Sequence, residues 1–270
     1  MENKKIAIIG VGNMGGAVAM GLLKSGFVPA SDIFVADRRE ATLQEMKSHG
    51  LNIGSNNREA AGKAEVIIVA VKPYHVEGVI SEIKPELLPG KILIVIVAGV
   101  DIKELGEMAG DDVPIFRVMP NTAIALQESL TCISSNKNCG PHKKYVTELF
   151  NKLGKTVEIP EELMAAATVL ASCGIAYALR YMRAAIQGGI EIGFSADMAQ
   201  YITAQTVKGA AELILQTGHH PEQEIDKVTT PRGITITGLN EMEHKGFSSS
   251  LIQGVLASYK KVENSGNLKK

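Results

Sequence analysis

The chain has 270 residues, 45% of them hydrophobic and 21% charged, and its formal net charge at pH 7 is -1. This length and composition allow at least one full core and favour two unequal domains in a globular protein. The balanced charge argues against nucleic-acid and membrane-surface partners, because both require an excess of positive charge.

The start of the chain and its cysteines predict a cytoplasmic protein. Residues 1–5, Met-Glu-Asn-Lys-Lys, run directly into a strand-like segment, and no apolar stretch is expected to approach the roughly 20 residues that cross a bilayer. Cys132, Cys139 and Cys173 do not combine with histidines at metal-ligand spacing, and their odd number disfavours a disulfide framework. We therefore expect reduced thiols and no metal site.

Short, nearly continuous apolar runs alternate with helix-like segments in the first part of the chain. Parallel strands buried on both faces are predicted at residues 6–9, 33–36, 66–71 and 92–97. Helical spacing predicts helices at residues 14–25, 41–49, 75–84 and 102–109. Two strands at residues 115–119 and 130–134, a helix at 142–153 and a strand at 156–159 follow. The pattern predicts an α/β Rossmann-type doubly wound sheet over residues 1–160.

The composition changes after Pro160, where strand signals become rare. Helices are predicted at residues 165–171, 175–192, 196–216 and 249–262. Residues 161–270 should therefore form a smaller all-α domain. Several of these helices have small or apolar residues around much of their own circumference. A single bundle of these helices would therefore leave some apolar faces uncovered. We expect a homodimer through the helical domain, and whether dimers assemble further is left open.

A glycine-rich segment, residues 10–15, follows the first predicted strand and opens the first predicted helix. This is the context of a dinucleotide-binding GxGxxG loop. Its glycines make the turn tight and let backbone amides reach a pyrophosphate at the positive end of the helix. Glycines used only for a tight turn are the alternative.

Three charged residues at the end of the second strand bear on the choice of cofactor. Asp37 is typical of a site for a ribose 2′-hydroxyl, whereas Arg38 and Arg39 suit a 2′-phosphate. We expect NADPH, with NADH as the other candidate; the alternative for the arginines is a solvated helix start. Asn57, at the head of the next helix, could equally be a helix cap.

Several segments resemble the pyrroline-5-carboxylate reductases. In the first domain they are residues 57–73, 97–100 and 117–122, and in the second domain residues 228–239 are similar to the family signature. The resemblance spans nearly the whole chain in the right order. It implies an enzyme that reduces 1-pyrroline-5-carboxylate to L-proline by hydride transfer from NAD(P)H, the last step of proline biosynthesis.

The resemblance also implies roles for individual residues. Pyrophosphate contacts fall on Gly10, Gly12, Asn13, Met14 and Gly15. Further contacts to the cofactor fall on Asn57, Ala70, Lys72 and Pro73. The cofactor candidates Met119, Pro120 and Asn121 would line the cleft between the domains. For Lys72 the alternative is a lysine that caps a strand end, and for residues 120–121 it is a turn.

The substrate site is implied at a helix N-terminus in the second domain. Backbone amides near Gly233, Ile234 and Ile236 would hold the substrate carboxylate. Thr235 would be the catalytic residue, hydrogen-bonded to the ring nitrogen as it gains a proton; the alternative is that Thr235 only caps the helix.

Two positions depart from the family pattern. The usual Gly-Gly-Thr-Thr is replaced by residues 232–235, which removes one glycine, at Arg232, and one hydroxyl, at Ile234. Cys173 stands where a serine is expected, either as a weaker donor to the substrate or as a small buried side chain. Reduction of another small cyclic imine therefore stays open as an alternative.

Two other functions are weighed against this one. A beta-hydroxyacid dehydrogenase combines a similar sheet with a helical domain, but it needs a lysine one turn before an asparagine on the first long helix of its second domain. Here residues 175–187 offer Arg180 and Arg183 and no lysine. A dinucleotide-binding regulatory protein without catalysis is the candidate from a different class. It would bind the cofactor without oxidising it when the imine is added.

Overall fold

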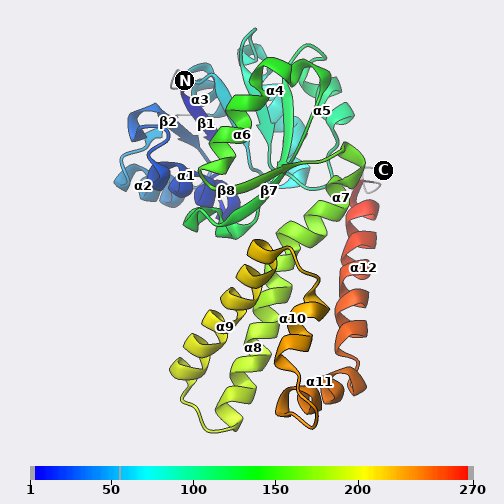
Figure 1. Cartoon of the computed structure of the whole chain (residues 1–270). Helices are drawn as coiled ribbons and strands as arrows, with labels where there is room; N and C mark the ends of the chain where they lie inside the picture. Colours follow the sequence, from blue (N-terminus) through cyan, green and yellow to red (C-terminus); the bar gives the residue numbers. More distant parts are fainter. Residues whose placement is uncertain (1–3, 55, 267–270) are drawn as a thin grey trace. The chain divides into compact units, whose positions relative to one another are not determined.

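The computed structural model describes residues 4–54 and 56–266, and it contains two compact units (Figure 1). The sheet unit comprises the chain up to Cys173 and the segment from Tyr259 onward, and the helical unit comprises residues 174–258. The boundary at residue 160 stays a prediction; the compact units of the structure divide after Cys173.

The sheet unit is built on eight strands in the order β3-β2-β1-β4-β5-β6-β7-β8. The first six by position are β1 (Ile6–Ile9), β2 (Ile33–Ala36), β3 (Asn52–Ile53), β4 (Val66–Val69), β5 (Ile92–Val95) and β6 (Ile115–Met119), all parallel. Ile6 pairs with Ile33 on one side and with Val66 on the other, so the strand order reverses direction at β1. Ligands of such sheets bind at the carboxyl ends of the strands beside this switch point.

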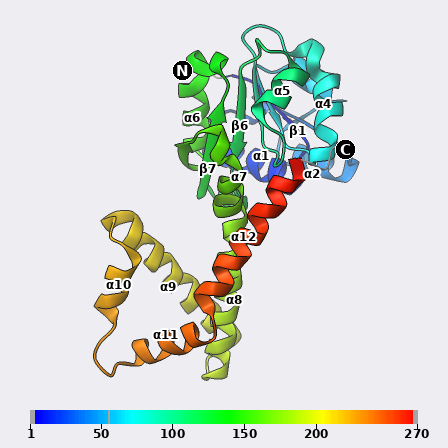
Figure 2. The same ribbon diagram turned by 90° about the vertical axis from the view of Figure 1, so that its right-hand side faces the viewer.

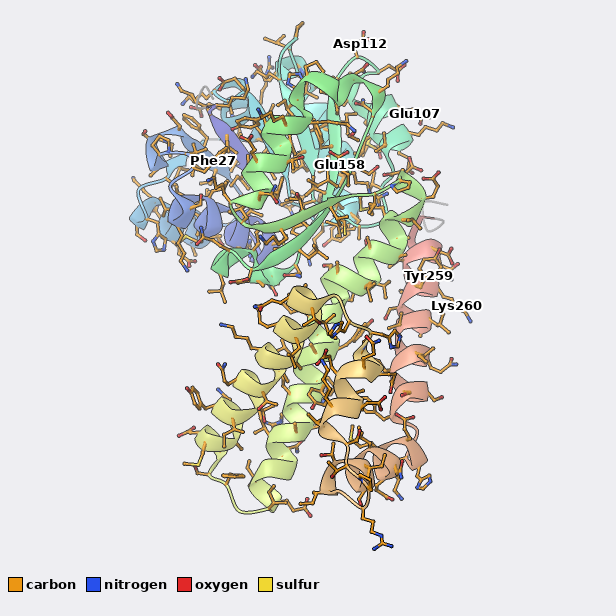
Figure 3. The ribbon with its side chains drawn as sticks, viewed as in Figure 1. Phe27, Glu107, Asp112, Glu158, Tyr259 and Lys260 are labelled. Carbon is orange, nitrogen blue, oxygen red and sulfur yellow. The ribbon has the colours of Figure 1, made fainter. Side chains whose placement is uncertain are left out.

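Helices cover both faces of the sheet, which explains the continuous apolar runs in its strands. The helices are α1 (Asn13–Ser25), α2 (Glu40–Ser48), α3 (Asn57–Gly62), α4 (Val76–Ile83), α5 (Ile102–Ala109) and α6 (Lys143–Asn151). One buried cluster joins the sheet to α1, α2 and α6, and a second joins it to α3, α4 and α5. Phe27, labelled in Figure 3, packs its ring 5.9 Å from that of Tyr145 and so ties the end of α1 to α6.

The structure gives the directions of the last two strands, which the sequence analysis did not predict, and it moves some strand ends. β7 (Ser129–Ser135) is antiparallel to β6, and β8 (Gly154–Glu158) is parallel to β7. The short link between β6 and β7, which holds the 3-10 helix Thr122–Leu126, is too short for a parallel crossover. β4 and β5 end at Val69 and Val95, two residues earlier than predicted, and the two-residue β3 was not predicted.

The helical unit continues from α7 (Met164–Ala167) and the π-helix Thr168–Cys173. Its helices are α8 (Gly174–Glu191), α9 (Ala196–Thr217), α10 (Pro221–Val228), α11 (Ile234–His244) and the first part of α12 (Phe247–Gly266). α10 was not predicted. The α/β sheet followed by helices confirms the predicted fold class.

The helical unit has little interior of its own. Of its residues, all of which the structure describes, only Ala199 is buried. α8 and α12 are joined by a 2.7 Å hydrogen bond from Tyr177 Oη to Ser258 Oγ, and the rings of Tyr181 and Phe247 lie 6.4 Å apart. In Figure 2, α9, α10 and α11 follow one another as an open series rather than a closed bundle.

One helical stretch corrects an expectation from the sequence. In the described part of the chain, residues Glu161–Glu191 form a helix that is long and apolar enough to cross a membrane by length and composition, and 17% of its most apolar window is buried. The prediction that no apolar stretch approaches this length is wrong. Length and composition are the only support for a membrane span, and an uncovered subunit interface has the same properties.

Candidate cofactor and active site

The loop between β1 and α1 contains two glycines that no other residue can replace without a shift. Gly10 has φ +87°, and a Cβ there would lie 2.8 Å from Cγ1 of Val71. A Cβ on Gly15 would lie 1.9 Å from the carbonyl oxygen of Gly10. The loop therefore turns tightly beside the residues that follow β4.

The first turn of α1 is open to an anion. Its N-cap residue is Gly12, which has no side chain with which to cap the helix, and no acidic residue lies in this turn. Backbone N–H groups at such a helix end need acceptors, and the helix dipole makes the end positive. This arrangement suits a pyrophosphate.

A cavity of about 660 Å³ lies at the carboxyl ends of β1, β2 and β4 and belongs entirely to the sheet unit. This is within the size range of small-molecule sites. Of the predicted cofactor residues, those that line it are Gly10, Gly12, Asn13, Met14, Asp37, Arg38, Arg39, Asn57, Ala70 and Lys72.

The remaining cofactor candidates, Gly15, Pro73, Met119, Pro120 and Asn121, do not line this cavity. Gly15 acts through its close approach to Gly10. The lining residues that sequence reasoning missed are Ile9, Ala36, Val71, Tyr74, His75, Gly78, Val79, Glu82 and Ile96. Most of these follow a strand end directly or lie on α4 behind it, and that position is the signal that could have identified them.

Asp37 is fully engaged with protein donors. Its Oδ1 accepts hydrogen bonds from the backbone N–H (2.9 Å) and Nε (3.0 Å) of Arg39, and its Oδ2 accepts from the Val11 amide (2.9 Å) and Nη2 of Arg39 (3.1 Å). Burial raises the pKa of Asp37, but the Arg39 bonds, the Arg39 charge and the Val11 amide outweigh it and hold this pKa below its ordinary value. Because a carboxylate has about four acceptor positions, a ribose hydroxyl would have to displace one of these donors.

Arg38 makes a different contact from its neighbour. Its Nη2 lies 2.7 Å from Nε2 of His75, which belongs to the 3-10 helix Pro73–His75. The Tyr74 and His75 rings are edge to face with their centroids 4.3 Å apart. Within residues 4–54 and 56–266, Arg38 therefore presents its charge to the cavity without a carboxylate partner of the kind that Arg39 has.

Asn57 is not the cap of α3. The N-cap is Asn56, whose Oδ1 accepts from the Glu59 amide at 2.8 Å, so the helix-cap explanation for Asn57 is wrong. Asn57 donates from Nδ2 to Oε2 of Glu82 on α4 at 2.8 Å, and both residues line the cavity. Lys72 is exposed at the same cavity and is the N-cap of the 3-10 helix that follows it.

Residues 119–121 make structural contacts within the sheet unit. Met119 is buried against Cys132 and Met164. The Asn121 side chain accepts from the Ala123 amide at 3.0 Å and donates to the Ala171 carbonyl at 3.2 Å, so it caps one short helix and holds the π-helix. These contacts favour the turn explanation for residues 120–121. Cys173 is a half-buried free thiol at the end of the π-helix.

The candidate substrate residues gather at the start of α11 in the helical unit. The Gly233 amide donates to the Thr230 carbonyl at 2.8 Å and closes a turn in which Arg232 has φ +61°. Gly233 is the N-cap and Thr235 lies in the first turn, so the explanation that Thr235 caps the helix is wrong. Thr235 and Ile234 are exposed and Ile236 is half-buried.

Metal ligands do not converge in the ranges 4–54 and 56–266. No group of three or more His, Cys, Asp or Glu side chains there could hold a metal ion. The buried thiols of Cys132 and Cys139 are disfavoured as thiolates, because burial raises the pKa of Cys132 and raises that of Cys139 to about 11.

Comparison with known proteins links both parts of the chain to reductases. Residues 161–265 match the family "Pyrroline-5-carboxylate reductase dimerisation", and residues 5–99 match "NADP oxidoreductase coenzyme F420-dependent". Pyrroline-5-carboxylate reductase 2 of Dictyostelium discoideum is 41% identical, with 98% of this chain and 94% of that protein covered. Pyrroline-5-carboxylate reductase 1 of the same organism is also 41% identical over 94% of this chain, which spans about half (48%) of that longer relative.

A solved structure gives the same result. The pyrroline carboxylate reductase of Plasmodium falciparum, with NADP bound, superposes with a TM-score of 0.90 at 33% identity and covers 98% of this chain and 99% of its own.

Proposed function

The chain belongs to the pyrroline-5-carboxylate reductase family, and from this premise we infer that it reduces 1-pyrroline-5-carboxylate to L-proline with NAD(P)H, the last step of proline biosynthesis. The observation that carries this function is similarity over almost the full length of a relative and of an NADP-bound structure. Reduction of another cyclic imine and a regulatory protein without catalysis are not favoured.

The cavity of the sheet unit fits a dinucleotide. The uncapped start of α1 suits the pyrophosphate, and the glycines at positions 10 and 15 keep a space that a Cβ would fill. Bound NAD(P)H would supply the hydride for the reaction. Asn57, Ala70 and Lys72 line the same cavity and are proposed as further cofactor contacts.

NADPH is the proposed preference over NADH. All the acceptor positions of Asp37 are filled by Arg39 and the Val11 amide, so this carboxylate is poorly placed to bind a ribose 2′-hydroxyl. Arg38 faces the same cavity as a cation and suits a 2′-phosphate.

The residues at the start of α11 are proposed to bind the substrate and assist the proton transfer. Backbone amides near Gly233, Ile234 and Ile236 would hold the substrate carboxylate at the positive end of the helix. The Thr235 hydroxyl would hydrogen-bond the ring nitrogen as it is protonated. Cys173 is proposed to lie near the substrate, where it replaces the expected serine as a weaker donor.

A homodimer through the helical unit and a cytoplasmic location complete the proposal. The match of residues 161–265 to a dimerisation family and the many uncovered apolar side chains of α8 and α9 support the dimer. The three cysteines are free, as in a reducing compartment.

A steady-state assay tests the function directly. Purified protein is supplied with 1-pyrroline-5-carboxylate and with NADPH or NADH, and both cofactor oxidation and proline formation are measured. We expect one proline per cofactor oxidised and a higher kcat/KM with NADPH. Cofactor binding without oxidation would identify a regulatory protein, and faster turnover of a different cyclic imine would identify a different substrate.

A further inference from the structure

His75 occupies a defined position in the cofactor cavity. It ends the 3-10 helix Pro73–His75, is the N-cap of α4 and is half-buried. Its Nε2 lies 2.7 Å from Nη2 of Arg38. A guanidinium group can only donate hydrogen bonds, so Nε2 is the acceptor in this contact and the ring N–H is then at Nδ1.

We propose that His75 is a specificity-determining residue for the 2′-phosphate of the cofactor, which it binds together with Arg38. Before the cofactor binds, Nε2 of His75 accepts from the Arg38 guanidinium and holds it in place. When the phosphate enters, His75 takes up one proton, and both cations contact the phosphate. The proposal rests on the proposed use of NADPH.

The charged groups around His75 are compatible with a second positive charge, on His75, beside that of Arg38. The charged and titratable groups on the surrounding elements, the β2–α2 loop, the 3-10 helix and α4, are Asp37, Arg38, Arg39, Lys72, Tyr74, Glu77 and Glu82. Arg39 pairs with Asp37, and Glu82 accepts a hydrogen bond from Asn57. His75 itself is in contact with Arg38, whose Nη2 lies 2.7 Å from its Nε2.

A phosphate monoester carries about -1.5 to -2 charges at pH 7, more than one guanidinium can balance. Imidazole is the side chain that ordinarily changes charge between pH 5 and 8, so it can supply the second positive charge. The Tyr74 ring is an uncharged neighbour, with its centroid 4.3 Å from that of the imidazole ring. Because the phosphate and the proton favour each other's binding, the affinity for NADPH should rise with proton concentration.

NADH lacks the 2′-phosphate and serves as the matched ligand. Kd values for NADPH and NADH are measured between pH 6 and 8.5 for the parent protein and for His75→Gln, whose amide oxygen can still accept from Arg38 but cannot be protonated. Proton uptake is measured by calorimetry in buffers of different ionisation enthalpy. His49→Gln, at the end of α2 outside the cavity, is the control for loss of an imidazole.

At pH 8.5 the parent and His75→Gln should bind NADPH within about twofold of each other. At pH 6 the parent should bind about tenfold more tightly, with proton uptake that the variant lacks. Comparison at each pH cancels the titration of the phosphate itself. His49→Gln should behave as the parent, and NADH affinity should not distinguish the proteins.

A parent-to-variant ratio that does not change with pH would overturn the proposal, as would an equal loss of NADH affinity, which would show that His75 only shapes the cavity. These readouts are binding constants, so they stand apart from the enzyme assay. Failure to reduce 1-pyrroline-5-carboxylate would remove the proposed function while leaving the binding result to be judged separately.

Discussion

The two units of the chain bury their apolar residues to very different extents. In the sheet unit, β1, β4 and β5 are buried along their whole length, and clusters on both faces of the sheet enclose them. In the helical unit only Ala199 is buried, while large apolar side chains such as Tyr201, Leu215 and Ile234 stand exposed on its helices.

This difference separates two ways of building a site. The cofactor cavity is shaped by residues whose positions the sheet unit's own core fixes. The start of α11, where the substrate is proposed to bind, belongs to a unit whose helices have almost no shared interior. Its conformation should therefore depend on the surface that covers it in an oligomer.

The largest effect is expected from a charge placed on the uncovered helical surface. Ile202 and Leu213 on α9 are 41% and 49% exposed in the single chain. Ile202→Asp combined with Leu213→Asp should give monomers without measurable turnover, because buried, unpaired carboxylates oppose association. Sedimentation velocity and the steady-state assay measure both effects.

The control for this variant lies in the sheet unit. Leu88, in the loop before β5, is 56% exposed, and Leu88→Asp should remain dimeric and active. If the α9 double variant is a folded, active dimer, then this face of α9 is not the subunit interface, and the proposed difference between the two units is contradicted.

The second effect concerns chemistry in the helical unit. Thr235→Ala should lower kcat by roughly a hundredfold to a thousandfold, the usual loss when a positioned hydrogen bond to the reacting group is removed. NADPH affinity should scarcely move, because we propose that the cofactor binds in the cavity of the sheet unit. Steady-state kinetics and cofactor titration measure these separately.

Serine at this position should retain most of the turnover, because it keeps the hydroxyl. Thr237→Ala is the matched control. It also removes a threonine hydroxyl from α11, but this hydroxyl donates to the carbonyl of the N-cap residue Gly233 at 3.2 Å. If the Thr235→Ala enzyme is folded, binds NADPH normally and turns over within about threefold of the parent, Thr235 has no role in catalysis.

The third effect should be confined to the sheet unit. Arg38→Ala should lower the ratio of kcat/KM for NADPH to that for NADH by roughly 10- to 150-fold, which corresponds to a charge-assisted contact of about 1.5–3 kcal/mol. Arg39→Ala should shift the ratio in the same direction, because Asp37 loses its cation and then repels the 2′-phosphate. An unchanged ratio in both variants would show that the 2′-phosphate is not bound here.

The smallest effect is expected on the free energy of unfolding, when one residue with a left-handed backbone conformation in each unit is replaced by glycine. Arg232 and Gln127 have φ +61° and +63°, in the left-handed region that costs an ordinary residue about 1–2 kcal/mol. Arg232→Gly should raise the free energy of unfolding by roughly 1 kcal/mol or less, because glycine also gives the unfolded chain more freedom.

Gln127→Gly should gain less than Arg232→Gly, since Gln127 also donates to the Lys152 carbonyl at 3.2 Å. Thermal unfolding measures both changes. Only the Arg232 variant should alter KM for the substrate. Equal effects of the two substitutions on KM would show that position 232 is not part of the substrate site.

The sequence was most informative where one local rule decides the structure. The buried parallel strands and the glycine loop were predicted because continuous apolar runs and the GxGxxG pattern have few other structural explanations. The direction of β7 was not, because an apolar run is the same in either direction and only the short preceding link constrains it. The family resemblance, carried by short motifs in both domains, was confirmed.

About half of the residues that line the cavity proposed for the cofactor were among those named from the sequence. The residues near motifs were found, whereas His75, Val79 and Glu82 were missed because their place depends on how α4 packs beside the end of β4. The same limit explains the wrong cap at Asn57: adjacent asparagines offer the same side chain, and only the helix geometry chooses Asn56.

The return of the chain to the sheet unit at Tyr259 has a consequence for synthesis on the ribosome. The first 173 residues of the sheet unit emerge together, but its last segment follows only after the whole helical unit. At roughly 5–20 residues per second, residues 174–270 take about 5–20 s to translate. During that time, the helices that have already been synthesised lack both the closing segment and a second chain, so we expect a chaperone to be most useful in this interval.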